Sequence, residues 1–339
     1  MTTEEGTAAD WTGVARSMAP EEITAAAVSG ALPLDVDRTV GLGQHLLQLQ
    51  EFDAAERFLA VARASGDAGV RGAAENGVAA RELMRGERRR AGAALKRAEA
   101  TGHPDVVEEA RLTRALAATD PDEMVVLFRV CSRSPRERVA QEAALELGFM
   151  LLHGGGSREE ALELLSVAHR SGQPYVEARA AVELADDLME QAPRGQLPPA
   201  EHERVLTWLR QAEDSPYPAV LAKAELLHGL VHWERHEPEP ARELWLRSAR
   251  RHMPYSSYRS AINLVIDCLQ DDGAGPLVAA QHLEHALLAE PAAAPDRLVT
   301  TALDSARPFQ VVVALALTQA EKSPDRVLRR AAKRALKRF

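Results

Sequence analysis

The sequence predicts an all-α protein built as a stack of helix pairs, and three observations support this fold class. One helix-pair pattern returns every 32 to 44 residues along most of the chain. Strong helix formers (Ala, Leu, Glu and Arg) dominate, and no alternating run of Val, Ile and Thr indicates a strand. Aromatic residues make up only 4% of a chain that is 46% hydrophobic, so small side chains must fill the core between closely packed helices.

Each copy of the pattern places three small or apolar residues on one face of its second helix, with the consensus Ala-x3-Leu-x2-Ala. A repeat of this length is one supersecondary unit, which must stack on its neighbours to bury its apolar face. In chain order the copies are Ala55/Leu59/Ala62, Ala91/Leu95/Ala98, Ala161/Leu165/Ala168, Val205/Leu209/Ala212, Ala241/Trp245/Ser248 and Ala279/Leu283/Ala286. A degenerate copy, Glu123/Leu127/Val130, lies between the second and the third.

Short breaks rich in Ser, Gly and Pro separate the copies. Proline stops one helix and is tolerated in the first turn of the next, while Gly and Ser satisfy helix ends. We therefore expect helix boundaries at residues 65–69, 101–105, 132–136, 171–175, 214–218 and 252–256, with a longer connection at 192–201.

The ends of the chain differ from the repeats. We expect a flexible acidic N-terminus over 1–19, a capping helix over 20–35 that begins near Pro20, and the helical repeat array over 36–290. Over 291–339 we expect helices near 296–306 and 308–321 and a final basic amphipathic helix, because the open end of a stack exposes apolar surface.

The helix pairs resemble the tetratricopeptide repeat, whose first helix carries a Leu-Gly pair and whose second carries Ala. Matching pairs are Leu42-Gly43 with Ala55, Leu147-Gly148 with Ala161, and His228-Gly229 with Ala241. The resemblance implies a right-handed α-solenoid of about seven helix-turn-helix repeats. The family's first-helix Trp is missing, the third copy lacks the Leu-Gly pair, and Ala185 and Val265 replace Gly, so a related helical-repeat class is the alternative.

Composition narrows the function classes. A net charge of −9 argues against a surface built entirely for nucleic acid. Cys131 and Cys268 lie in apolar helical stretches, and we find neither a signal peptide nor a transmembrane segment, so we expect a cytoplasmic protein. Arginine (36 residues) far outnumbers lysine (5), which is typical of a GC-rich bacterial genome such as an actinobacterial one.

The resemblance also implies that the first helix of each pair lines a concave groove. Apolar residues there increase toward the C-terminal half (Phe149, Met189, Leu230, Trp233 and Ile266), and a cation recurs at the first inward position (Arg71, Arg179, Lys223 and Arg259). Polar residues of the inward set include Asp37, Gln44 and Glu142. Cations beside apolar pockets suit an acidic or C-terminal peptide segment, unless they pair with Glu on neighbouring helices.

We therefore expect a scaffold or adaptor that binds a protein or peptide, without catalysis or cofactor; a regulatory sensor for a small peptide or metabolite is the alternative.

One histidine cluster could carry chemistry. His228, His232 and His236 follow one another at intervals of four residues, and two histidines on one helical face can share a metal, with Glu225 or Glu237 nearby. The HExxH arrangement of a zinc hydrolase is absent. The alternatives are a metal site, with a metal-dependent enzyme as the least favoured function, or buried histidines that hydrogen-bond across the helix pair.

The last segment is strongly basic, with 8 basic and 2 acidic residues over 321–339. A basic amphipathic helix can contact nucleic acid or an acidic membrane surface. Alternatively it is a cap whose cations neutralise the acidic remainder of the chain.

Overall fold

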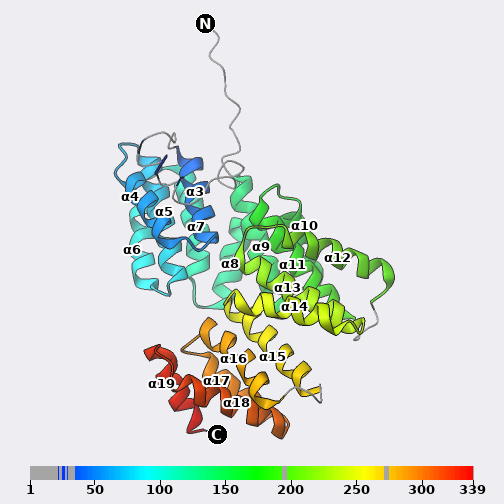
Figure 1. Cartoon of the computed structure of the whole chain (residues 1–339). Coiled ribbons are helices and arrows are strands. Elements are labelled where there is room, and N and C mark those ends of the chain that lie inside the picture. The colour runs from blue at the N-terminus through cyan, green and yellow to red at the C-terminus, as the bar shows by residue number, and fades with distance from the viewer. Residues whose placement is uncertain are drawn as a thin grey trace. The chain divides into compact units, whose positions relative to one another are not determined.

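The computed structural model describes residues 22, 25–26, 29, 35–192, 197–270 and 275–338, and every regular element among them is an α-helix (Figure 1). The all-α prediction is therefore confirmed. The chain divides into an N-terminal unit (Met1–Ala180) and a C-terminal unit (Ala181–Phe339), with helix α11 running through the boundary.

The N-terminal unit contains α3 (Val36–Gln48), α4 (Phe52–Arg63), α5 (Ala68–Met84), α6 (Arg88–Glu99), α7 (Pro104–Ala117), α8 (Pro121–Cys131), α9 (Glu137–His153), α10 (Arg158–His169) and the start of α11 (Pro174–Gln191). The C-terminal unit continues with α12 (Pro199–Glu213), α13 (Pro218–Glu234), α14 (Pro238–Arg250), α15 (Pro254–Gln270), α16 (Pro276–Ala289), α17 (Ala294–Leu303), α18 (Arg307–Ala320) and α19 (Arg326–Leu336). Each of the six predicted breaks coincides with a helix boundary, and all but 132–136 include the first one to three residues of the following helix.

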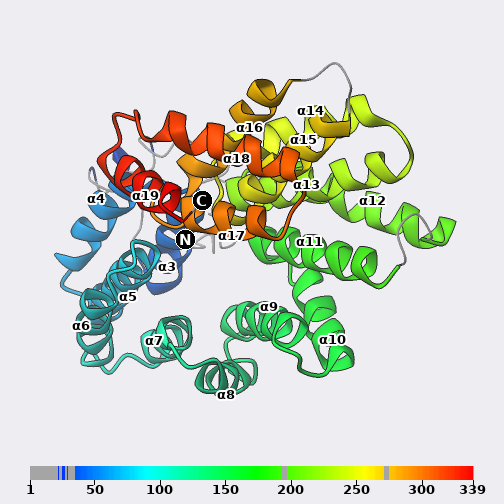
Figure 2. The ribbon, with the colours of Figure 1, turned by 90° about the horizontal axis from the view of Figure 1, so that it is seen from below.

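Neighbouring helices pack in pairs, as a helical repeat requires. The packed pairs include α3–α4, α5–α6, α7–α8, α9–α10, α13–α14 and α15–α16. Within the N-terminal unit, Figure 2 shows α3, α5, α7 and α9 along the inner side of an arc, with their partners α4, α6, α8 and α10 outside them. Residues on the first helices of these pairs therefore face one another across the inner side.

The second-helix pattern forms the buried seam of each pair. All three residues of each of the six regular copies are at most 4% exposed. The degenerate copy was predicted in the wrong register: Glu123 and Val130 are exposed, whereas Phe128 and Cys131 are fully buried. The seam of α8 is therefore Met124/Phe128/Cys131, one residue later, because the large Phe128 ring fills the place that Leu127 was expected to occupy.

A small residue on the first helix lets the second helix approach closely. A Cβ added at Gly43 would lie 3.4 Å from Leu59, and one added at Gly148 would lie 2.9 Å from Leu165. At Gly229 the Cβ would lie 2.5 Å from Cδ1 of Trp245. In all three pairs the glycine thus faces the central residue of the predicted second-helix pattern.

Helix starts follow from local sequence. Asp35, Asp67 and Ser157 cap α3, α5 and α10 by accepting a backbone N–H three residues on, at 2.8, 2.9 and 3.2 Å. Proline occupies the first turn of α7, α8, α12, α13, α14 and α16. These signals are local in sequence, which is why the boundaries could be predicted.

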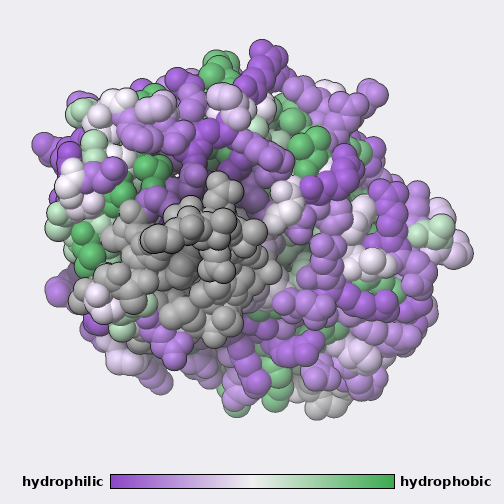
Figure 3. All heavy atoms as spheres, turned by 90° about the horizontal axis from the view of Figure 1, so that it is seen from above, coloured by the Kyte–Doolittle hydropathy of each residue, from purple (hydrophilic) through white to green (hydrophobic). Residues whose placement is uncertain are grey.

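The last pair and the C-terminal helices share one hydrophobic core. It contains buried residues of five helices, among them Val265, Leu283, Leu298, Val312 and Leu328. The N-terminal capping helix predicted over 20–35 falls largely outside the described residues, although Ala26 packs against the core of α3 and α4. On the face shown in Figure 3 polar residues predominate and hydrophobic ones form small separate patches.

The seam contact can be tested with two glycine substitutions. Gly229→Ala should lower the free energy of unfolding by about 1–3 kcal/mol, because the added methyl forces Trp245 to shift. Gly92→Ala in the middle of α6 meets nothing within 4 Å and should be neutral or stabilising by up to about 1 kcal/mol. Urea unfolding followed by circular dichroism compares the two; equal effects would contradict the close approach.

Candidate functional site

The cations predicted at the first inward position serve different structural roles. Arg179 of α11 forms an ion pair with Glu146 of α9, with Nη1 2.5 Å from Oε1 and Nη2 3.1 Å from Oε2. Its guanidinium carbon also lies 5.6 Å from the centre of the partly buried Phe149 ring. Arg179 and Phe149 thus lie together, but the charge of Arg179 is already matched by a carboxylate of the chain itself.

Lys223 of α13 is paired more strongly. Its Nζ lies 2.6 Å from Glu183 and 2.8 Å from Asp186, both on α11, and its side chain is 13% exposed. Burial alone would lower the pKa of Lys223, but the two carboxylates outweigh burial and the pKa is raised. Lys223 therefore remains charged and bridges two helices of the C-terminal unit.

A sequence rule explains which cations are paired. Glu146 and Glu183 each stand two residues before the small seam residue of their helix, Gly148 and Ala185. Each binds the cation of the next first helix, as the Arg179 and Lys223 contacts show. The equivalent residue of α13 is the buried Leu227, so Arg259 of α15 meets no carboxylate there. In the first pair the position is Gly41, and Arg71 donates instead to the backbone carbonyls of Ser65 and Gly66.

One face of α15 is open to solvent. Arg259 is exposed and stacks over Tyr255, with its guanidinium carbon 5.8 Å from the ring centre and Nη1 3.4 Å from the hydroxyl. Tyr255 is 53% exposed and Ile266 is 42% exposed. Spacings of four and seven residues put the three side chains on one side of the helix. Among the described residues, Arg259 forms no ion pair with a carboxylate.

The other predicted apolar anchors lie partly in the core. Leu230 and Trp233 pack against the buried cluster of Leu226, Ala241 and Trp245, and the two tryptophan rings are 5.6 Å apart. Met189 of α11 is also partly buried. These side chains support the fold, and only part of their surface is available to a ligand.

The histidine cluster is paired with carboxylates. Nδ1 of His228 lies 2.8 Å from Glu213, and Nδ1 of His232 lies 2.6 Å from Glu237. The rings of His228 and His232 stack 4.9 Å apart. The hydrogen bond with His232 is the main reason that the pKa of Glu237 is lowered.

The third histidine does not share this helical face. Helix α13 ends at Glu234, and His236 follows in a left-handed turn with φ 60°. Glu225, which we considered as a further ligand, binds Arg251 at 2.6 and 2.8 Å. Across the part of the chain that the structure describes, no group of three or more His, Cys, Asp or Glu side chains is placed to hold a metal ion.

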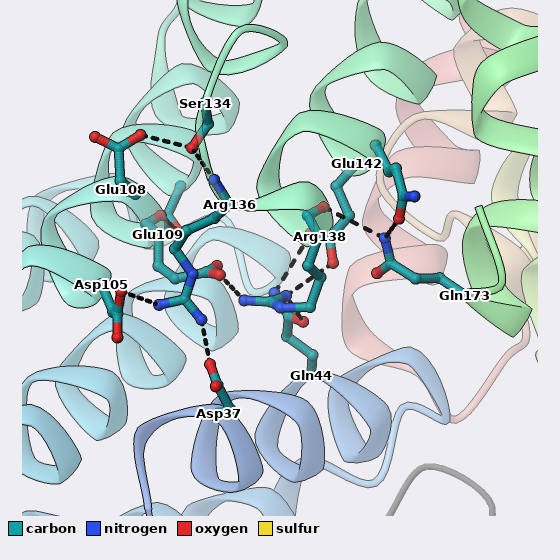
Figure 4. Close-up of polar contacts among 12 residues, drawn as sticks. Asp37, Gln44, Asp105, Glu108, Glu109, Ser134, Arg136, Arg138, Glu142 and Gln173 are labelled. Carbon is teal, nitrogen blue, oxygen red and sulfur yellow. Dashed lines mark hydrogen bonds and ion pairs between the residues drawn. The ribbon is translucent and has the colours of Figure 1, made fainter. Parts of the chain in front are cut away.

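The N-terminal unit contains a polar cluster that the sequence did not reveal as a site (Figure 4). Arg138 of α9 forms ion pairs with Glu109 of α7 and, at 2.9 Å, with Glu142 of its own helix. It also donates to Gln44 of α3, 94 residues away in the sequence. The side chain of Glu109 is only 1% exposed, so Arg138 compensates a buried charge.

Arg136 extends this cluster toward the start of α3. It forms ion pairs with Asp37 and, at 3.2 Å, with Asp105, while Ser134 donates to Glu108 at 2.8 Å. Asp37, Gln44 and Glu142 were predicted to face inward, but their meeting with Arg136 and Arg138 depends on the curvature of the first four pairs. The cluster links α3, α7 and α9, and each of its two arginines bridges two carboxylates.

Neither cysteine is placed as a reactive thiol. Both are buried, and burial raises the pKa of the Cys131 thiol to about 11, which makes it a poor nucleophile.

In the described ranges no helix is both long and apolar enough to cross a membrane.

The polar cluster predicts a large effect at Arg138. Arg138→Ala leaves Glu109 buried without its cation and should lower the free energy of unfolding by about 3–5 kcal/mol. Arg133→Ala, at an exposed position a few residues away, should change it by less than about 0.5 kcal/mol. Urea unfolding of both variants provides the comparison, and a small effect at Arg138 would mean that solvent reaches Glu109.

A pH dependence is expected at Glu142. Burial raises the pKa of Glu142 above 4.5 even though Arg138 acts in the opposite direction. The stability that this group contributes is therefore present below pH 4.5 and lost as the pH rises through the raised pKa. The free energy of unfolding of Glu142→Gln minus that of the wild type should therefore increase as the pH rises from 4 to 7. Urea unfolding at several pH values tests this, with exposed Glu159→Gln as control; a difference that falls with pH would contradict it.

The chain was also compared with known proteins. No protein-family model matches it, and neither does any functionally curated protein.

Proposed function

We propose that this protein is a non-catalytic binding scaffold whose C-terminal unit holds an acidic peptide segment of a partner protein on the open face of α15. The observation that carries the proposal is the state of the recurring cations. Arg179 and Lys223 are matched by carboxylates of the chain, whereas Arg259 is exposed beside the exposed Tyr255 and Ile266.

The chemistry of this face suits a carboxylate next to an apolar side chain. A guanidinium binds a carboxylate through two parallel hydrogen bonds, and such charge-assisted bonds are roughly twice as strong as neutral ones. The Tyr255 ring holds the Arg259 side chain in place, which reduces the entropy lost on binding. Ile266, eleven residues beyond Tyr255, lies about 16 Å along the helix and would contact an apolar side chain of the same segment.

The neighbouring helices hold α15 rigidly. Ser257 donates to the Ser248 carbonyl at 3.1 Å, Ser260 donates to the Ser248 hydroxyl at 2.9 Å, and Ser248 donates to the Ala222 carbonyl at 2.7 Å. This chain of buried serines ties α13, α14 and α15 together. A helical-repeat scaffold of the tetratricopeptide type would present side chains on such rigid helices. We propose this architecture, a right-handed solenoid, for the repeat array.

The proposal predicts that binding depends on Arg259 and Ile266. The probe is a fluorescent peptide library in which Glu and Leu are fixed four to eight residues apart, and fluorescence anisotropy measures binding to the full chain. We expect Arg259→Gln and Ile266→Ser each to weaken the best peptide about tenfold, which corresponds to about 1.4 kcal/mol.

Two matched controls separate this effect from general charge or hydrophobicity. Arg250→Gln removes an exposed arginine from α14, and Val278→Ser removes an exposed apolar side chain from α16. Both should bind the peptide as wild type does, and thermal unfolding should be the same for all four variants. The proposal is wrong if no peptide binds, or if the controls weaken binding as much as the α15 variants do.

A further inference from the structure

We propose that α19 carries a second interaction surface, a basic face that binds the phosphate backbone of nucleic acid without reading its sequence. The basic face consists of Arg326, Arg330, Lys333, Arg334 and Lys337, all exposed. Their spacing of four, seven, eight and eleven residues places them in one stripe on one side of the helix. At 1.5 Å per residue the stripe is about 16 Å long.

Within the described residues, carboxylates leave the charges of the basic face unmatched. Of the neighbouring cations, Arg338 pairs with Asp296 at 3.0 Å and Arg329 donates to the Ser323 carbonyl at 2.7 Å. Among the described residues, none of the five residues of the basic face forms an ion pair. Asp325, directly before the helix, accepts the backbone N–H groups of Val327 and Leu328.

The apolar side of α19 is already occupied. Leu328, Ala331, Ala332 and Ala335 are at most 3% exposed, and α19 packs against α17 and α18. The cap function that we expected as one alternative therefore uses the side opposite the basic face, and the two functions do not compete. A membrane-surface helix must place its apolar side in the bilayer, which this packing prevents.

The basic face also fits nucleic acid better than an acidic protein segment. No apolar side chain interrupts the stripe, since the half-exposed Val327 lies beside it, so a peptide would find no apolar anchor there. A phosphate backbone presents regularly spaced charges and needs no apolar anchor.

The rest of the chain limits the contact to α19. Residues 321–339 carry 8 basic and 2 acidic side chains, so the remaining chain has a net charge of −15 and repels a polyanion. We therefore expect weak binding, with a Kd of roughly 10⁻⁴ to 10⁻⁶ M near physiological salt, and a steep salt dependence.

The test measures the anisotropy of a fluorescent 20-base-pair DNA duplex with the full chain between 50 and 200 mM salt. With five phosphates neutralised, the slope of log K against log salt should be about −4.5. Arg330→Gln combined with Lys333→Gln should reduce the steepness by about 2 and weaken binding at 50 mM salt. The control, Arg89→Gln combined with Arg90→Gln, removes the same charge from exposed positions of α6 and should bind as wild type does.

Four outcomes would overturn the proposal. The first is no binding of DNA at 50 mM salt, and the second is an equal loss of binding in the α6 control. The third is that poly-glutamate competes as well as DNA at equal charge concentration, which would assign the basic face to an acidic protein. The fourth is that anionic vesicles bind while DNA does not, which would assign it to a membrane surface.

Discussion

The close approach of the two helices in each pair is the constraint on which the rest of this structure depends. In three pairs a glycine of the first helix lies directly against the central residue of the second, Leu59, Leu165 or Trp245. Because this contact fixes the distance between the helices, small residues can fill the seam on either side of it. A core with few aromatic residues is then sufficient.

Most of the fold could be predicted from the sequence because its signals are local. Prolines, helix caps and the Ala-x3-Leu-x2-Ala pattern act within one or two helical turns. The observed helix boundaries follow the prolines and caps, and the core of the C-terminal unit contains Ala279, Leu283 and Ala286 of the last copy of the pattern. The register of α8 could not be predicted in this way. Without small residues to mark the seam, Leu127 and Phe128 are equally good candidates, and packing against α9 selects the larger ring.

The candidate sites were only partly predictable. The four cations recur at one position of the sequence pattern, but whether each is available to a ligand depends on a carboxylate contributed by the preceding pair, which a single helix does not reveal. The polar cluster around Arg138 is harder still, because Gln44 and Arg138 meet only through the curvature accumulated over four pairs. Because arginine is abundant across the chain, the sequence alone does not distinguish Arg138 or Arg259 from arginines on the general surface.

The ion pairs between successive first helices bear on how such an array can evolve. Arg179 and Lys223 occupy equivalent positions, so loss of the α11–α12 pair would place Lys223 opposite Glu146 and leave no carboxylate stranded. Loss of the α13–α14 pair would instead place Arg259 opposite Glu183, closing the face that we propose for binding. The same loss would remove Arg242 of α14 and leave the buried Asp267 of α15 without its cation, so closing this face by recombination also carries an electrostatic cost within the next module.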